Sequence, residues 1–190
     1  MKTTRRRLLQ AGLAGLAAPA VRDIAAAAPG PAAAPSDASI KAASGSGWAA
    51  WKKPTPTLEL PDLEGHQRSL DELIGQVVIV NFWATWCEPC QKEIPAMSEV
   101  ADRYGDDGLH LLAVNNAESR EKIDEFLDRF QIQGLVLHDR NGIAVRDWNV
   151  LGMPANFLVD REGKVRSWHL GALDWTQPAV LNPVTALLAA

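Results

Sequence analysis

Two cysteines give this chain its clearest chemistry. Cys87 and Cys90 are its only cysteines, and Glu88 and Pro89 lie between them. Two thiols at this spacing can complete thiol–disulfide exchange, because one attacks a partner disulfide and the other resolves the mixed disulfide. The same spacing is half of many zinc or copper sites, which need further ligands. The histidines lie singly, without the paired spacing of such a site, at His66, His110, His138 and His169. We predict a redox pair with no metal or cofactor.

The residues around the cysteines predict how the pair is held. Residues 77–82 form a short apolar run rich in β-branched side chains, which is typical of a central strand covered on both faces. Pro89 suits the first turn of a helix, where its missing N–H costs nothing, so Cys87 should lie at the helix N-terminus. Unpaired backbone N–H groups and the helix dipole stabilise a thiolate there. Cys87 is therefore the predicted nucleophile.

The remaining chain alternates predicted strands and helices. Strands are expected at residues 58–60, 66–69, 109–114, 135–137, 155–159 and 164–170. A capping box at residues 69–72 opens a short helix that ends at Gly75. Further helices are expected from the cysteines to about Tyr104, and at residues 123–130, 143–148 and 176–188. This order predicts an α/β protein with a mixed sheet and helices on both faces.

Several ordered motifs carry a family resemblance. VNFWATWCEPCQKEIP, which contains the cysteines, resembles the thioredoxin superfamily, and WCEPC followed by Lys92 and Glu93 resembles its TlpA/ResA-like branch of exported thiol–disulfide oxidoreductases. The resemblance continues through VNNAES, GMPANFLVD and REGKV, and covers roughly Pro54 to the C-terminus. It implies a thioredoxin fold with an N-terminal β-hairpin extension and a central helical insertion near residues 119–130.

The resemblance also implies roles for three further residues. Pro154 should follow a cis peptide bond, with Met153 packed against the cysteine pair and its backbone open to an extended substrate. Glu93 should be a partly buried acid that exchanges protons with Cys90, although a solvated helix glutamate is the alternative that its sequence position allows. Asn81 stands where cytoplasmic thioredoxins carry a buried aspartate, and this favours Glu93 as the proton carrier.

The residues beside Cys87 suggest a client surface and a redox direction. We expect Trp86 to shield Cys87 and to contact the substrate together with Glu88, Pro89 and Met153, whereas Trp83 should belong to the core. The Glu88 carboxylate opposes the helix dipole and so destabilises a thiolate. Since a stabilised reduced form is what makes a strong oxidant, this favours a reductant.

Two other protein classes fit the sequence less well. A peroxidase of the peroxiredoxin type needs a Pro-x-x-x-Thr-x-x-Cys arrangement, but Val80 and Ala84 stand at its proline and threonine positions. A copper-delivery protein of the Sco type would have three residues between its cysteines and a downstream histidine ligand. His138 and His169 lie among apolar neighbours in or beside predicted strands, so we interpret them as structural.

The first quarter of the chain has the composition of a targeting segment and a linker. Lys2 and three arginines precede a mildly apolar stretch and small residues, which predicts an export signal over residues 1–28 that resembles the twin-arginine type. General secretion and an uncleaved signal anchor are the alternatives. Residues 29–53 are rich in Ala, Pro and Gly and are expected to be a flexible linker, so that the thioredoxin-like domain spans residues 54–190.

These observations predict an exported, periplasmic protein-disulfide reductase. Its clients would be specific disulfide-containing proteins, in cytochrome c maturation or with copper-site cysteines, and a membrane dithiol would donate its electrons. A general periplasmic dithiol oxidase or isomerase, or a copper-binding metallochaperone, is the alternative. The net charge of −4 gives no support for nucleic-acid binding. We expect a monomer.

Overall fold

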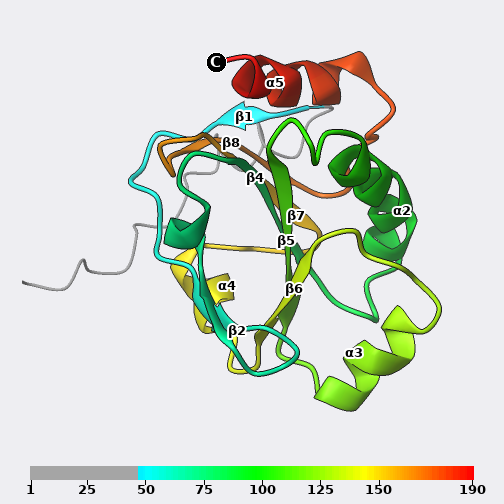
Figure 1. Ribbon diagram of the computed structural model, residues 1–190. Coiled ribbons are helices and arrows are strands. Elements are labelled where there is room, and N and C mark those ends of the chain that lie inside the picture. The colour runs from blue at the N-terminus through cyan, green and yellow to red at the C-terminus, as the bar shows by residue number, and fades with distance from the viewer. Residues whose placement is uncertain (1–46) are drawn as a thin grey trace, which may run out of the picture.

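The computed structural model describes residues 47–190 (Figure 1). The expected export signal at residues 1–28 and residues 29–46 of the expected linker lie outside this part of the chain. Within residues 47–190, no helix combines the length and the apolar character needed to cross a membrane.

A six-stranded mixed sheet forms the centre of the domain. Its strand order is β1-β8-β7-β4-β5-β6. The strands are β1 (Ala49–Ala50), β4 (Val77–Trp83), β5 (Leu109–Asn116), β6 (Leu135–Asp139), β7 (Ala155–Val159) and β8 (Val165–Leu170). Strand β4 is buried along its whole length. It runs parallel to β5 and antiparallel to β7. The predicted central strand and mixed sheet are thus confirmed.

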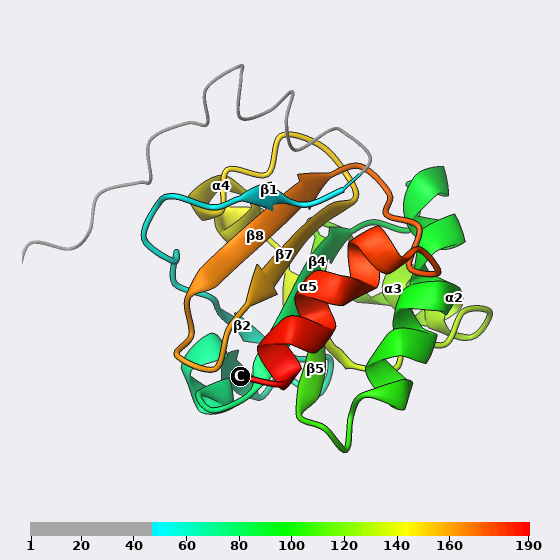
Figure 2. The same cartoon turned by 90° about the horizontal axis from the view of Figure 1, so that it is seen from above.

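Helices cover both faces of the sheet, as predicted. Helices α2 (Glu88–Arg103), α3 (Arg120–Leu127) and α5 (Pro178–Leu188) pack on one face. Figure 2 shows α5 lying beside α2 on this face. The short helix α4 (Ile143–Asp147) covers the other face, together with the segment that contains β2 (Glu59–Pro61), β3 (Gln67–Ser69) and the 3-10 turn η1 (Leu70–Leu73). Each face therefore has its own apolar core, and β4 contributes alternate residues to both.

The N-terminal hairpin and its capping box form as the sequence predicts. Strands β2 and β3 pair antiparallel. Ser69 Oγ accepts a hydrogen bond from the Asp71 backbone N–H at 3.2 Å, and the Ser69 N–H donates to Glu72 Oε1 at 3.0 Å. Gly75 follows with a φ of 93°, a left-handed conformation that glycine adopts without strain. The inserted helix α3 ends at Leu127, before the expected end at residue 130, because the next residues form turns.

Residues 47–51, which we name the N-terminal strap, belong to the folded domain. Strand β1 pairs antiparallel with β8, with Ala49 opposite Trp168. Trp48 packs on the core that contains α2 and α5, and Trp51 packs on the opposite core. The expected linker boundary at residue 53 is therefore wrong. Two indoles that bury apolar surface on opposite faces of the sheet outweigh the flexible composition of the segment before them.

Candidate active site

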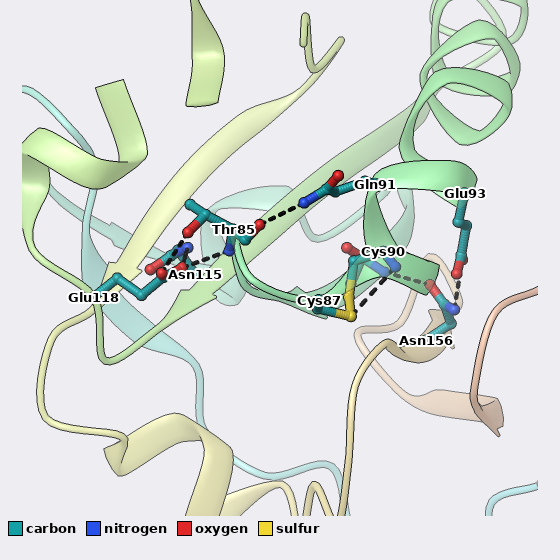
Figure 3. Close-up of a disulfide and its surroundings, with 9 residues drawn as sticks. Thr85, Cys87, Cys90, Gln91, Glu93, Asn115, Glu118 and Asn156 are labelled. Atoms are coloured by element: carbon teal, nitrogen blue, oxygen red, sulfur yellow. Dashed lines mark hydrogen bonds between the residues drawn. A yellow bond between two sulfur atoms is a disulfide. The ribbon is translucent and has the colours of Figure 1, made fainter. Parts of the chain in front are cut away.

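Cys87 and Cys90 form a disulfide at the N-terminus of α2 (Figure 3). Cys87 is the N-cap residue, and its Sγ accepts a hydrogen bond from the Cys90 backbone N–H at 3.2 Å. Pro89 lies in the first turn, as predicted. Cys87 is 4% exposed and Cys90 is 1% exposed, so the predicted nucleophile is the more exposed of the two cysteines. The arrangement suits attack by Cys87 and resolution by Cys90 from within.

Glu93 lies one helical turn beyond Cys90 and is buried. Its Oε1 accepts hydrogen bonds from Asn156 Nδ2 at 2.7 Å and from Trp175 Nε1 at 2.9 Å, whereas its Oε2 has no partner among the described residues. Burial raises the pKa of Glu93 to about 7, against the opposing effect of these hydrogen bonds and of the Leu173 backbone. The side chain is thus placed in the core rather than in solvent, and it can gain or lose a proton near neutral pH.

A pair of buried asparagines connects Glu93 to the centre of the sheet. Asn81 on β4 lies opposite Asn156 on β7, and Asn81 Nδ2 donates to Asn156 Oδ1 at 2.8 Å. Figure 3 shows the amide of Asn156 directed toward the Glu93 carboxyl group. Asn156 was not among the predicted site residues. A polar residue inside the otherwise apolar strand ANFLV was the signal that could have identified it.

The loop before β7 has the conformation that the resemblance implies. The Met153–Pro154 peptide bond is cis. Met153 packs against the core cluster that contains both cysteines. Within residues 47–190, no backbone hydrogen bond engages Met153. Its N–H and C=O groups are available to an extended polypeptide.

A second buried carboxylate, Glu118, holds the loop that leads into the cysteines. The Thr85 N–H donates to Glu118 Oε2 and the Thr85 hydroxyl donates to Glu118 Oε1, each at 2.6 Å, and Asn115 Nδ2 donates to Oε2 at 2.9 Å. Gln91 Nε2 donates to the Thr85 carbonyl at 2.6 Å, which connects this loop to α2. Ala117 adopts a φ of 54°, an uncommon conformation for a non-glycine residue that is often kept near functional sites.

Glu118 was not among the predicted site residues, although it lies in the motif VNNAES. Three groups donate to it, and both of its carboxyl oxygens act as acceptors. The acid lies two residues beyond β5, where the carboxyl ends of adjacent parallel strands meet, and this position was the available signal.

The predicted client-contact residues beside Cys87 reach the surface. Trp86 is 69% exposed, and Glu88 and Pro89 are also exposed. Trp83 is fully buried, as predicted. Glu88 Oε1 accepts a hydrogen bond from Lys92 Nζ at 2.7 Å, and this contact lowers the pKa of Glu88. The Lys92 ammonium group offsets part of the Glu88 charge. Glu88 therefore destabilises the Cys87 thiolate less than its position alone predicts, and it favours a reductant less strongly.

The two histidines interpreted as structural have structural contacts. His138 Nε2 hydrogen-bonds the Glu118 backbone carbonyl at 2.7 Å. His169 Nδ1 hydrogen-bonds the Gly47 carbonyl at 2.9 Å, and burial lowers the pKa of His169. In the part of the chain that is described, the one acidic and histidine cluster compact enough to hold an ion is Asp62, Glu64 and His66. It includes neither cysteine.

A thioredoxin-like sheet with a C-x-x-C disulfide at a helix N-terminus defines a thiol–disulfide oxidoreductase. Residues 52–168 match the AhpC/TSA family, and the chain belongs to that family. The chain is 36% identical over 118 residues to the thiol-disulfide oxidoreductase ResA of Geobacillus kaustophilus, covering 62% of this chain and 68% of the relative. It is 37% identical over 121 residues to the thioredoxin-like protein YneN of Bacillus subtilis, covering 62% and 70%.

A solved structure gives the same result. The chain superposes with a TM-score of 0.67 on a protein from Chlorobium tepidum described as a thiol:disulfide interchange protein DsbE, at 32% identity, covering 72% of this chain and 96% of that one. The protein is therefore an enzyme of thiol–disulfide exchange. Val80 and Ala84 occupy the positions at which a peroxidase of the peroxiredoxin type would need proline and threonine. The relatives named ResA and DsbE are described by thiol–disulfide chemistry instead.

Proposed function

We propose that this enzyme works as a reductant of disulfides in specific client proteins. The observation that carries this proposal is the buried Glu93, whose pKa is raised to about 7 by burial, one helical turn from the resolving cysteine. A group that is partly ionised at neutral pH can accept the proton that Cys90 must lose before it attacks. Glu118 adds a second buried carboxylate next to the active-site loop. Acidic surroundings destabilise thiolates and so favour a reducing couple.

The reaction balances with the chain's own residues and one external dithiol. The Cys87 thiolate attacks a client disulfide, forms the mixed disulfide, and releases a client thiolate that takes a proton from water. Glu93 then accepts the Cys90 proton, and Cys90 attacks the Cys87 sulfur. The second client thiolate leaves and is protonated. Two electrons pass to the client, and the Cys87–Cys90 disulfide is restored. An external dithiol must reduce this disulfide before the next cycle.

The client surface favours an extended segment with apolar side chains near its cystine. Four large hydrophobic residues in the described chain are exposed, and two of them, Trp86 and Leu151, belong to the loops that carry Cys87 and Pro154. The backbone of Met153 can pair with such a segment. Pro89 and Glu88 complete the surface on the side of α2.

The location and partners follow from the sequence and belong to the same proposal. Residues 1–28 act as an export signal that resembles the twin-arginine type, and the enzyme works in the periplasm as a monomer. Its electrons come from a membrane dithiol donor, because the periplasm is kept oxidising and lacks a reducing thiol buffer. Its clients are proteins with cytochrome c haem-attachment or copper-site cysteines.

The reduction potential of the Cys87/Cys90 pair tests the direction of the reaction. The oxidised protein is equilibrated with glutathione and with dithiothreitol buffers at pH 7, and the thiols are trapped and counted. A potential near or below about −270 mV supports a reductant, whereas one near about −120 mV identifies an oxidant and overturns the proposal. Cys90→Ala should accumulate a mixed disulfide with a peptide client, and Cys87→Ala should form none.

A further inference from the structure

We propose that Trp175 is a positioning residue for Glu93 and that the N-terminal strap, through Trp48, holds Trp175 in place. The start of the folded domain thereby controls proton transfer at the redox pair. This inference rests on the proposed proton-carrying role of Glu93.

The first contact in this chain joins Trp175 to the acid. Trp175 lies between β8 and α5 and is 1% exposed. Its Nε1 donates to Glu93 Oε1 at 2.9 Å. An indole N–H is a donor only, so this contact stabilises the ionised carboxyl group more than the neutral one. Asn156 donates to the same oxygen, and Oε2 has no hydrogen-bond partner among the described residues.

The second contact joins the strap to Trp175. The rings of Trp48 and Trp175 meet edge to face, with centroids 5.9 Å apart and planes at 77°. Trp48 Nε1 donates to the Val180 carbonyl in α5 at 3.0 Å. The strap therefore touches both the indole and the helix that follows it, and pairing of β1 with β8 fixes its register.

Trp51, in the same strap, provides a matched comparison. Its ring packs edge to face against Phe157 and Trp168, with centroids 5.6 Å and 6.0 Å away. These residues belong to the core on the opposite face of the sheet from Glu93. Both tryptophans anchor the strap, but only Trp48 contacts Trp175.

The pKa of Glu93 is controlled by burial, by the hydrogen bonds from Trp175 and Asn156, and by the Leu173 backbone, because no other charged group of the described chain faces its carboxyl group. Strands β4 and β7 carry no titratable side chain, and the other charged residues of α2 are exposed. Asp174, beside Trp175, is also exposed. His169 lies opposite Asn156 on β8, and burial lowers its pKa, so it is neutral near pH 7. Its bond to the Gly47 carbonyl is a further contact with the strap.

The test measures Glu93 directly, by carbon-13 NMR of its carboxyl group in the oxidised, full-length protein. Trp175→Phe keeps most of the ring and removes the donor, so the pKa of Glu93 should rise by about one unit, which is tenfold in the protonation equilibrium. Trp48→Ala should let water reach the indole. Hydrogen exchange at the Trp175 indole N–H should become at least about tenfold faster, and the pKa of Glu93 should rise, as in Trp175→Phe, because a displaced indole no longer donates to Oε1. Trp51→Ala should change neither quantity.

Each comparison can overturn one part of the inference. An unchanged Glu93 titration in Trp175→Phe refutes the positioning role, and equal effects of Trp48→Ala and Trp51→Ala refute the specific link from the strap. The NMR titration involves no client. Full reductase activity in Glu93→Gln would therefore defeat the proposed proton transfer without changing the titration results, so the two failures are distinguishable.

Discussion

Replacing Glu93 by glutamine should stabilise the protein at alkaline pH while slowing its catalysis. The substitution keeps an oxygen that can accept from Asn156 and Trp175, and it removes the buried charge. The folded protein holds the pKa of Glu93 at about 7, and an unfolded chain returns it to 4.5. Between these values the folded state binds more protons, so the stability of the wild-type protein falls as the pH rises from 4.5 to 7 and stays low above that.

The size of this effect follows from the shift in pKa. Each unit corresponds to about 1.4 kcal/mol, so ionisation of Glu93 costs the folded protein about 3 kcal/mol at pH 8 and about 1 kcal/mol at pH 5. Glutamine removes this cost. Its amide nitrogen replaces the unpartnered Oε2, however, and burying this donor without a partner lowers the free energy of unfolding by roughly 1 kcal/mol. The variant should therefore be about 2 kcal/mol more stable than wild type at pH 8 and about equally stable at pH 5.

Urea unfolding of the oxidised proteins at pH 5 and pH 8 measures this difference. Glu99→Gln is the matched control, because Glu99 is exposed on the same helix, and it should leave the pH dependence unchanged. If wild type and Glu93→Gln lose stability equally between pH 5 and pH 8, Glu93 does not titrate as a buried acid and the reasoning fails. Stopped-flow measurement of mixed-disulfide resolution should show the slower catalytic step.

Three further substitutions test the other parts of the site. Glu118→Gln replaces an acceptor oxygen with a donor nitrogen at Thr85, so it should lose about 1–3 kcal/mol of stability in urea and give a less negative reduction potential. Glu121→Gln, at an exposed position of α3, should do neither; an unchanged potential in Glu118→Gln would contradict the electrostatic role. Trp86→Ala should change stability by less than about 0.5 kcal/mol and raise the KM for a peptide disulfide roughly tenfold; an unchanged KM would remove Trp86 from the client surface. Lys92→Met frees the Glu88 carboxylate and should make the potential more negative; a less negative value would show that Glu88 does not act on the couple.

The sequence was sufficient for the parts of the site that are local in the chain. Strand β4, the N-cap position of Cys87 and the first-turn Pro89 lie within one short stretch, where periodicity and helix capping operate directly. The buried position of Glu93 agreed with the family resemblance. From helical spacing alone, a solvated side chain remained the alternative, because the residues that cover it come from elsewhere.

The partners of these residues could not be predicted because they are distant in sequence. Asn156 and Trp175 reach Glu93 across 63 and 82 residues, and Glu118 reaches Thr85 across 33. No local pattern specifies which polar side chain a folded sheet will bring to a given acid. The folded strap was not predicted for a related reason. Ala, Pro and Gly in the preceding segment indicated flexibility, but Trp48 and Trp51 pack on Trp175 and Trp168, which lie more than a hundred residues further along the chain.

The position of β1 also has a consequence for how the protein behaves at high concentration. Strand β8 would otherwise be the outer strand of the sheet, with backbone groups open to pairing with another molecule. The two residues of β1 pair with Ser167 and Trp168 on that edge, and the Trp51 N–H donates a hydrogen bond to the Arg166 carbonyl at 3.0 Å. Trimming the chain beyond residue 51 would uncover this edge and promote aggregation, so any processing of the N-terminus must stop short of the strap.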